Sequence, residues 1–180
     1  PFQAIVIGVS TGGVRALKIL LGRLPANFPL PVLIVQHISA DAGNGMAKLL
    51  DDLCRIHVKE ADEQDVIVPG TVYLAPPNYH LLVEKGGMLS LSADPPVSFA
   101  RPSVDVLFES AALVFGRGLI GVVLTGANHD GSRGACAIKR NGGMVVVQDP
   151  DDAEARQMPE ATLAATTAAH VVALDGMAAL

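Results

Sequence analysis

Short runs of aliphatic residues recur along the chain, and most of them are followed by a segment with helical spacing. Three of these runs, at 4–7, 32–35 and 119–125, are almost entirely apolar, which is typical of strands buried on both faces of a sheet. Strands that alternate with helices need crossover connections, which favour parallel pairing. The sequence therefore predicts an α/β fold: a doubly wound, mostly parallel sheet with helices on both faces.

The middle of the chain has a different pattern. The segments 66–75, 80–84 and 88–91 are short strand candidates, separated by turns rich in proline and glycine. Such a pattern is typical of antiparallel hairpins, and we expect one at an edge of the sheet. Helices are expected at 12–24, 44–53, 103–115, 131–140 and 159–167, and further strands at 56–59, 144–147 and 171–173. Ser103 is expected to cap its helix.

Composition excludes several classes of protein. Of the 180 residues, 50% are hydrophobic and 17% charged, which indicates a folded chain of single-domain size. A net charge of −5 without clustered Lys and Arg disfavours nucleic-acid binding. No apolar run reaches the ~20 residues of a membrane-spanning helix, so we expect no membrane insertion. The two cysteines form no C-x-x-C pair and are expected to be reduced and buried, as in the cytoplasm.

The carboxyl ends of parallel strands meet at one edge of a sheet, where functional residues gather. The first predicted strand ends in Gly8-Val9-Ser10-Thr11-Gly12, which fits the G-x-S-x-G pattern that exposes a nucleophilic serine on a tight turn. A helix N-terminus follows, and its free N–H groups favour a developing oxyanion. The same turn could instead cradle a phosphate, and the motif alone leaves both interpretations open.

Two more strand ends carry candidate catalytic residues. His37 follows the second buried strand, and Asp130 follows the strand at 119–125. A histidine can act as the general base for Ser10 at neutral pH, and an aspartate can orient that histidine. Taken singly, His37 could be structural and Asp130 could simply cap the helix that begins near Gly131. Together the three residues predict a catalytic triad, which geometry and not chain order defines.

Several segments resemble the catalytic domain of chemotaxis methylesterases (CheB type). They are I-G-V-S-T-G-G, V-Q-H, R-P-S-V-D-V-L-F, L-T-G-x-x-x-D-G and M-P-E-A, and they occur in the family's order over nearly the whole chain. The resemblance implies hydrolysis of glutamate γ-methyl esters on the cytoplasmic helices of chemoreceptors, and often deamidation of glutamines there. It also implies one catalytic domain at residues 1–180, without the receiver domain that usually precedes it.

Carried over by position, the resemblance makes Ser10 the nucleophile, His37 the base and Asp130 the orienting carboxylate. The backbone N–H groups of Thr11 and Ala127 would form the oxyanion hole. The family usually has Met and Gly where this chain has Ala127 and Asn128. Because asparagine tolerates the left-handed region better than most residues, we expect a positive φ at Asn128.

Other residues and partners are less defined. Arg101 opens the R-P-S-V-D-V-L-F segment and could contact an acidic substrate or form a structural ion pair. The remaining histidines lack the spacing of a zinc site, so we expect neither a metal nor a cofactor. The expected partners are a methylated receptor and a receiver domain on the same or another chain. The rival hypotheses are a nucleotide- or phosphate-binding module and an inactive adaptor that binds receptors.

Overall fold

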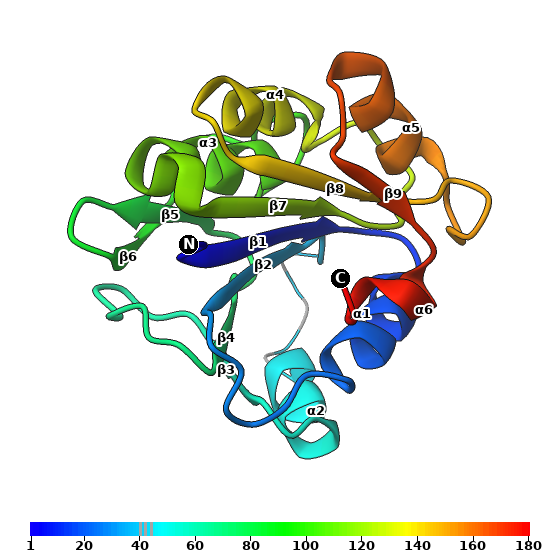
Figure 1. Cartoon of the computed structure of the whole chain (residues 1–180). Coiled ribbons are helices and arrows are strands. Elements are labelled where there is room, and N and C mark those ends of the chain that lie inside the picture. The colour runs from blue at the N-terminus through cyan, green and yellow to red at the C-terminus, as the bar shows by residue number, and fades with distance from the viewer. Residues whose placement is uncertain (40, 42, 44) are drawn as a thin grey trace.

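A seven-stranded parallel sheet forms the centre of the protein (Figure 1). The computed structural model describes residues 1–39, 41, 43 and 45–180. The strand order is β3-β4-β2-β1-β7-β8-β9, and every neighbouring pair is parallel. The strands are β1 (Ala4–Val9), β2 (Val32–Gln36), β3 (His57–Glu60), β4 (Thr71–Leu74), β7 (Leu119–Val123), β8 (Met144–Gln148) and β9 (His170–Val172).

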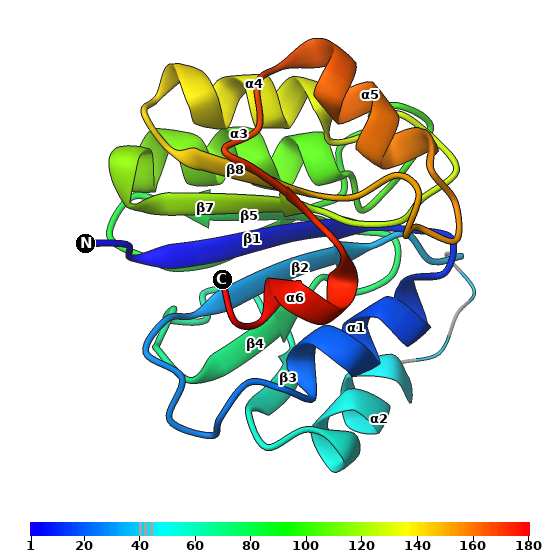
Figure 2. The same cartoon turned by 45° about the vertical axis from the view of Figure 1, so that its right-hand side comes forward.

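Helices cover both faces of this sheet (Figures 1 and 2). One face carries α3 (Val104–Phe115), α4 (Ser132–Arg140) and α5 (Gln157–Ala165), and the other carries α1 (Gly13–Leu21), α2 (Gly45–Leu53) and α6 (Leu174–Met177). Side chains alternate between two hydrophobic cores, because successive strand residues point to opposite faces. Val6 packs in the core under α3, and its neighbour Ile7 packs in the core under α1. The predicted doubly wound α/β fold is confirmed.

The middle segment differs in two respects from what the turn pattern indicated. β5 (His80–Glu84) and β6 (Met88–Ser92) form the expected antiparallel hairpin, but it is a separate two-stranded sheet that packs on α3 and not an edge of the main sheet. The segment 66–75, however, supplies β4, which pairs in parallel between β2 and β3. All four β4 residues are buried, as expected for an interior strand of a parallel sheet. Burial on both faces, and not the turn that precedes it, therefore determines which strands β4 pairs with.

The order of the strands fixes where the functional loops meet. β1 lies between β2 and β7, so the chain leaves β1 toward one edge of the sheet and later returns to its other side. Loops at the carboxyl ends of such neighbouring strands form the usual binding crevice of open α/β sheets.

The start expected at Asn44 for the second helix lies outside the described residues, and α2 is described from Gly45. Within the described ranges, no helix is long and apolar enough to cross a bilayer. Cys54 and Cys136 are free and only partly buried.

Candidate active site

The turn after β1 holds Ser10 in place through its main chain. The Ser10 N–H donates to the carbonyl of Thr125 at 2.9 Å, and its own carbonyl accepts the Gly13 N–H at 2.8 Å. Gly12 has a φ of 81°, a backbone conformation that residues with a side chain rarely adopt. A side chain at Gly13 would collide with the amide of Gln36. These glycines allow the sharp passage from strand to helix that presents Ser10.

Two further polar side chains secure this turn, one at the end of β2 and one shortly after β7. The Gln36 amide donates to the carbonyls of Ser10 at 2.9 Å and His37 at 3.0 Å. The Thr125 hydroxyl donates to the carbonyl of Thr11 at 2.8 Å. Sequence reasoning missed both residues, although a polar residue at the end of a buried strand was the signal that located His37. By contrast, the Ser10 hydroxyl makes no hydrogen bond within the described part of the chain.

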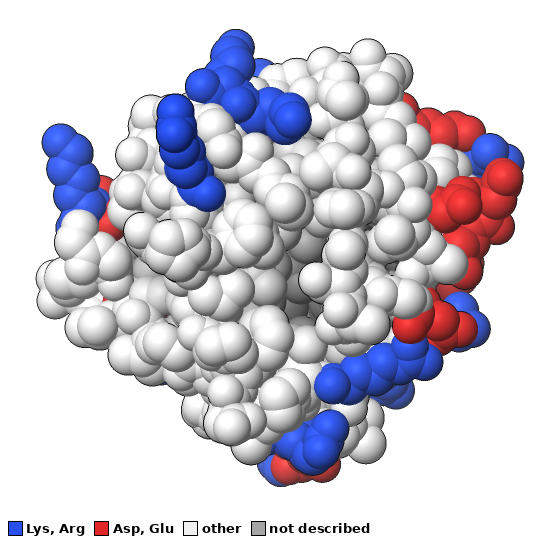
Figure 3. Space-filling model, viewed as in Figure 1, with Lys and Arg blue, Asp and Glu red and all other residues white. Residues whose placement is uncertain are grey.

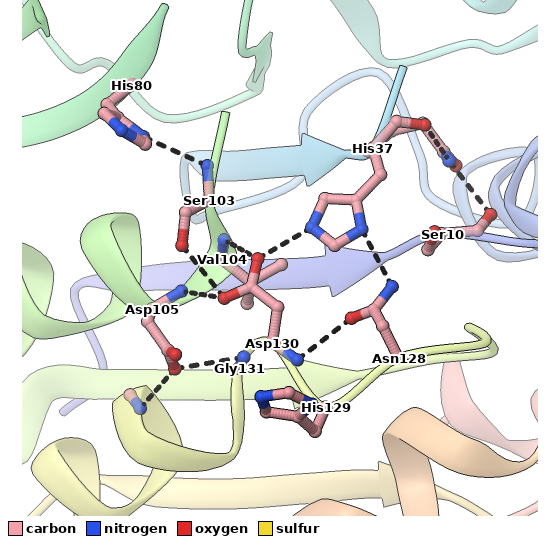
Figure 4. Close-up of polar contacts among 12 residues, drawn as sticks. Ser10, His37, His80, Ser103, Val104, Asp105, Asn128, His129, Asp130 and Gly131 are labelled. Carbon is pink, nitrogen blue, oxygen red and sulfur yellow. Dashed lines mark hydrogen bonds and ion pairs between the residues drawn. The ribbon is translucent and has the colours of Figure 1, made fainter. Parts of the chain in front are cut away.

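His37 and Asp130 come together although 93 residues separate them. The His37 Nε2 lies 2.7 Å from Asp130 Oδ2, and the Asp130 side chain is fully buried. Since a carboxylate can only accept, Nε2 carries the proton and Nδ1 presents a lone pair. Figure 4 shows His37 between Asp130 on one side and Asn128 and Ser10 on the other. The structure therefore brings the three predicted triad residues to the same edge of the sheet.

Asp130 also binds the N-terminus of α3. Its Oδ1 accepts the Ser103 hydroxyl at 2.9 Å and the Asp105 N–H at 3.0 Å, and its Oδ2 accepts the Val104 N–H at 2.7 Å. Ser103 does occupy the predicted N-cap position, but its hydroxyl makes no capping bond. The carboxylate of Asp130 satisfies the free helix donors instead, where the helix dipole favours a negative charge.

A second carboxylate makes the reciprocal contact. Asp105, in the first turn of α3, accepts the N–H groups of Gly131 at 3.0 Å and Gly134 at 2.7 Å at the start of α4. The cap of α4 is thus Asp105, and Asp130 caps α3. The two helices exchange carboxylates, and this exchange fixes the position of Asp130.

The exchange shifts the pKa values of the two carboxyl groups in opposite directions. Burial alone would raise the pKa of Asp130, but hydrogen bonds from His37 and from the Asp105 and Val104 N–H groups outweigh it and hold the pKa below its usual range. Burial raises the pKa of Asp105 to about 6, the Asp130 charge adds to this effect, and the bonds from Gly134 and Gly131 oppose it. Asp130 therefore stays ionised beside His37 at neutral pH.

Behind Asp130 lies a second buried histidine. His80 accepts the Ser103 N–H at its Nδ1 at 3.2 Å, and its Nε2 lies 3.0 Å from the carbonyl of Pro95. One nitrogen accepts and the other must donate, so His80 is neutral in this arrangement. A chain of contacts runs from His80 through Ser103 to Asp130 (Figure 4), and the carbonyl of Pro95 extends it beyond His80. Nothing in sequence spacing indicated it, because His80 and Ser103 lie on separate elements.

The expectation for Asn128 was wrong. The described non-glycine residues with positive φ are Gln64, Asn78, Ser98 and Phe99, and Asn128 is not one of them. Its side chain explains why asparagine fits here, since Oδ1 accepts the Asp130 N–H at 2.9 Å and closes a local turn. The amide nitrogen then lies 3.1 Å from Nδ1 of His37. Asn128 thus contacts His37 through its side chain.

The residues predicted for the oxyanion hole keep free donors. The Thr11 and Ala127 N–H groups make no hydrogen bond to any residue that the structure describes, and both residues are exposed. Arg101 lies in the wall of a pocket of about 520 Å³ that His37 and Asn128 also line. Its guanidinium donates to Asn78 Oδ1 and to the carbonyls of Ala93 and Asp94, so it holds neighbouring loops together.

A second pocket, of about 380 Å³, has a different chemistry. Apolar side chains line it, among them Phe2 and Leu180 near the two chain ends, and His170 is its single titratable residue. On the face that carries both chain ends, charged side chains surround an uncharged middle (Figure 3). Such a pocket cannot perform acyl transfer. No cluster of three or more His, Cys, Asp or Glu that could hold a metal occurs among the described residues.

Comparison with known proteins identifies the family. The CheB methylesterase model matches residues 5–180. The crystal structure of the Thermotoga maritima CheB methylesterase catalytic domain superposes with a TM-score of 0.94 at 32% identity, covering 99% of this chain and 96% of that one.

Curated relatives agree. A protein of Leptospira interrogans, provisionally named a protein-glutamate methylesterase/protein-glutamine glutaminase, is 50% identical over 99% of this chain and 93% of its own length. A protein-glutamate methylesterase/protein-glutamine glutaminase 1 of Anaeromyxobacter dehalogenans is 43% identical over 98% of this chain, which spans 51% of that protein. The chain therefore belongs to the CheB methylesterase family.

Proposed function

We propose that this protein-glutamate methylesterase domain hydrolyses glutamate γ-methyl esters of chemoreceptors with Ser10 as nucleophile, His37 as base and Asp130 as the orienting carboxylate. One observation carries the proposal: the 2.7 Å contact between His37 Nε2 and a fully buried Asp130 carboxylate, beside the Ser10 turn. An ionised carboxylate fixes the histidine tautomer and stabilises the imidazolium that forms when the serine loses its proton.

The first half of the reaction forms an acyl-enzyme. His37 Nδ1 takes the proton of the Ser10 hydroxyl, and the serine oxygen attacks the γ-carbonyl carbon of the ester. The oxyanion of the tetrahedral intermediate accepts hydrogen bonds from the Thr11 and Ala127 N–H groups, which have no other partner among the described residues. The C–O bond to the methoxy group then breaks, and Nδ1 returns its proton to that oxygen, so that methanol leaves.

The second half repeats these steps with water. Nδ1 removes a proton from a water molecule, and the water oxygen attacks the acyl carbon. The bond to the serine oxygen breaks, and that oxygen regains the proton from Nδ1. The products are a free glutamate side chain and an enzyme in its starting state. The carboxylic acid formed releases its proton to the solvent, and the resulting carboxylate carries the negative charge that the methyl ester lacked.

The Asn128 amide must release the Nδ1 lone pair of His37 during the first proton transfer. Its amide donates to the same Nδ1 lone pair that has to accept the serine proton, and one lone pair serves one linear donor well. Rotation of the amide is opposed by the hydrogen bond from the Asp130 N–H to Asn128 Oδ1. Asn128 therefore acts as a competitor of Ser10 and holds the base in its neutral tautomer at rest.

Deamidation is a second activity of the same machinery. Both named relatives carry the name protein-glutamine glutaminase as well. A glutamine side chain offers the same carbonyl, and ammonia leaves with the Nδ1 proton where methanol left before. Ammonia release from an unmodified receptor fragment that has glutamine at the modified positions tests this activity. No release, with methanol release intact, would limit the domain to esters.

The partners follow from the substrate. We place the domain in the cytoplasm, acting on the methylated cytoplasmic helices of chemoreceptors, with a receiver domain on the same or another chain as its regulator. The uncharged or apolar lining that surrounds His37, apart from Arg101, suits a neutral methyl ester better than a free carboxylate. Binding to nucleic acid and insertion into membranes have no part in the proposal.

One experiment separates this function from its rivals. A fluorophosphonate probe forms a covalent bond with an activated serine, so it should label Ser10 in an esterase. A phosphate-binding module or an inactive adaptor would not be labelled. Methanol release from a methylated receptor fragment then identifies the substrate. Labelling at another residue, or none, would contradict the assignment of Ser10.

A further inference from the structure

A strained hairpin tip lies at the rim of the pocket beside His37. The Val97 and Ala100 main chains exchange hydrogen bonds of 3.0 and 2.9 Å, which leaves a two-residue turn between them. Both turn residues have positive φ, 50° at Ser98 and 61° at Phe99. Turns of this kind favour asparagine and glycine. A bulky aromatic residue in this conformation is strained.

The ring of Phe99 has no compensating contact within the protein. It is 101% exposed, more than any other large hydrophobic residue of the described chain. A ring left in water contributes none of the hydrophobic stabilisation that its burial would give. Strain and exposure together are a poor arrangement for a residue that serves only the fold, and strained residues cluster at ligand-binding sites.

The surrounding loop holds the tip rigidly. Arg101 follows the tip and donates through Nη1 to the carbonyls of Ala93 at 2.8 Å and Asp94 at 3.1 Å. Its Nε and Nη2 donate to Asn78 Oδ1 at 3.1 and 2.7 Å. Because the backbone of the tip is held and an aromatic side chain has only two rotatable bonds, the ring contributes contact area with little loss of conformational entropy on binding, as hot-spot aromatic residues at protein interfaces do.

The position of the tip identifies what it would bind. Phe99 and His37 line the same pocket, and the reaction requires a glutamyl carbonyl beside this histidine. Only three bonds separate that carbonyl carbon from the substrate's main chain, so the substrate polypeptide must come close to the pocket rim. An occupant that stayed on Phe99 permanently would obstruct the pocket, whereas a substrate leaves after each turnover.

We infer that Phe99 is a docking residue, which contacts apolar side chains of the substrate polypeptide next to the reacting glutamyl ester. This inference rests on the proposed function, because it takes the substrate to be a protein. Ring contact adds affinity for the protein without touching the reacting atoms. A small ester has no polypeptide to contact the tip, and it depends on the catalytic residues alone.

Phe99→Asn is the sharpest test, because asparagine keeps the preference for positive φ and removes the ring. Binding is measured in the Ser10→Ala background by titration of the chain with a methylated cytoplasmic receptor fragment. The Kd should rise about ten- to a hundredfold on Phe99→Asn. Phe99→Tyr, which keeps the ring, should bind like the parent. Leu113→Ala is the control, since Leu113 is 79% exposed in the C-terminal half of α3, away from the Asp130 end.

Turnover supplies the second readout. With Ser10 intact, the ratio of kcat/KM on the receptor fragment to kcat/KM on p-nitrophenyl acetate should fall at least about tenfold in Phe99→Asn. An unchanged Kd would overturn the docking role, as would an absence of receptor binding in the parent chain. An equal loss on both substrates would assign Phe99 to the catalytic machinery, and a gain on the receptor would indicate an inhibitory occupant. If the unsubstituted chain binds the receptor but releases no methanol, the proposed function fails and the docking role does not.

Discussion

The two halves of the active site are built in opposite ways. Around Asp130, each carboxylate oxygen accepts two hydrogen bonds, from His37, Ser103 and two helix N–H groups. Around Ser10, the hydroxyl and the N–H groups of Thr11 and Ala127 have no partner in the described ranges. One half is saturated and buried, and the other is open.

The difference follows from what each half must do. A buried charge is costly unless hydrogen bonds satisfy it, so the half that orients the base has to be complete before any substrate arrives. Donors that will stabilise an oxyanion must stay free until that charge develops. In the proposed mechanism, the saturated half therefore contributes to folding and to catalysis, whereas the open half contributes to catalysis alone.

Ser10→Ala should give the largest effect and should affect activity only. Without the nucleophile, turnover should fall to the residual rate, roughly 10³–10⁴-fold above the uncatalysed reaction, that binding and the oxyanion hole alone provide. The free energy of unfolding should hardly change, because the lost hydroxyl makes no hydrogen bond in the described structure. Methanol release and a urea titration measure the two quantities. A variant with more than about a tenth of the parent activity would remove Ser10 from its role.

Asp130→Asn should lower both activity and stability. The asparagine amide places a donor where His37 or a helix N–H also donates, so the histidine loses its fixed tautomer and kcat should fall about 10³–10⁴-fold. At least one buried donor loses its acceptor, which should cost about 1–3 kcal/mol of unfolding free energy. His37→Ala is the matched comparison, with a similar loss of activity and a smaller loss of stability. Equal stability of the two variants would refute the contrast between the halves.

The meeting of the three candidate residues at one edge of the sheet could be predicted from the sequence because it depends on the pattern of the strands. A parallel sheet aligns the ends of buried strands, and Ser10, His37 and Asp130 each follow one of them closely. The position of β4 could not be predicted in the same way. Pro69-Gly70 precedes it like a hairpin turn, yet its partners β2 and β3 were chosen by burial on both faces.

Contacts between loops were beyond sequence reasoning. The bond from Asn128 to His37 joins residues 91 apart, and that from Ser103 to His80 joins residues 23 apart. The path of each loop determines both contacts, and no periodic pattern encodes such a path. The expectation of a positive φ at Asn128 failed because it considered the backbone alone, whereas the side chain forms the turn.

Asn128→Ala should have a moderate effect that sharpens the role of the open half. The amide of Asn128 donates to the same Nδ1 lone pair of His37 that has to accept the serine proton, so its removal should leave that lone pair free for Ser10. One net hydrogen bond contributes about 0.5–1.5 kcal/mol, so kcat/KM at neutral pH should equal that of the parent or exceed it by up to about tenfold. Methanol release from the receptor fragment measures the change. A variant that is slower than the parent would show that Asn128 does not compete.

Asp105→Asn should have the smallest effect, and it tests the saturated half through pH. Burial raises the pKa of Asp105 to about 6, so between pH 4 and 6 the folded state binds more protons than the unfolded chain. The contribution of Asp105 to the free energy of unfolding therefore decreases as the pH rises from 4 to 6, and it is smallest above pH 6. Asparagine keeps the Oδ1 that accepts both the Gly131 and Gly134 N–H groups and carries no charge.

At pH 7 the variant should thus have a Tm equal to or above that of the parent, by about 2–4 °C for each kcal/mol gained. The difference between the two Tm values should disappear toward pH 4. Its kcat should remain within about tenfold of the parent, because Asp105 reaches His37 only through Asp130. Melting curves between pH 4 and 7.5 measure the difference in Tm. A variant that is less stable at pH 7 would mean that the Asp105 charge itself holds α4 at its N-terminus, and that the exchanged carboxylates both stabilise the fold as anions.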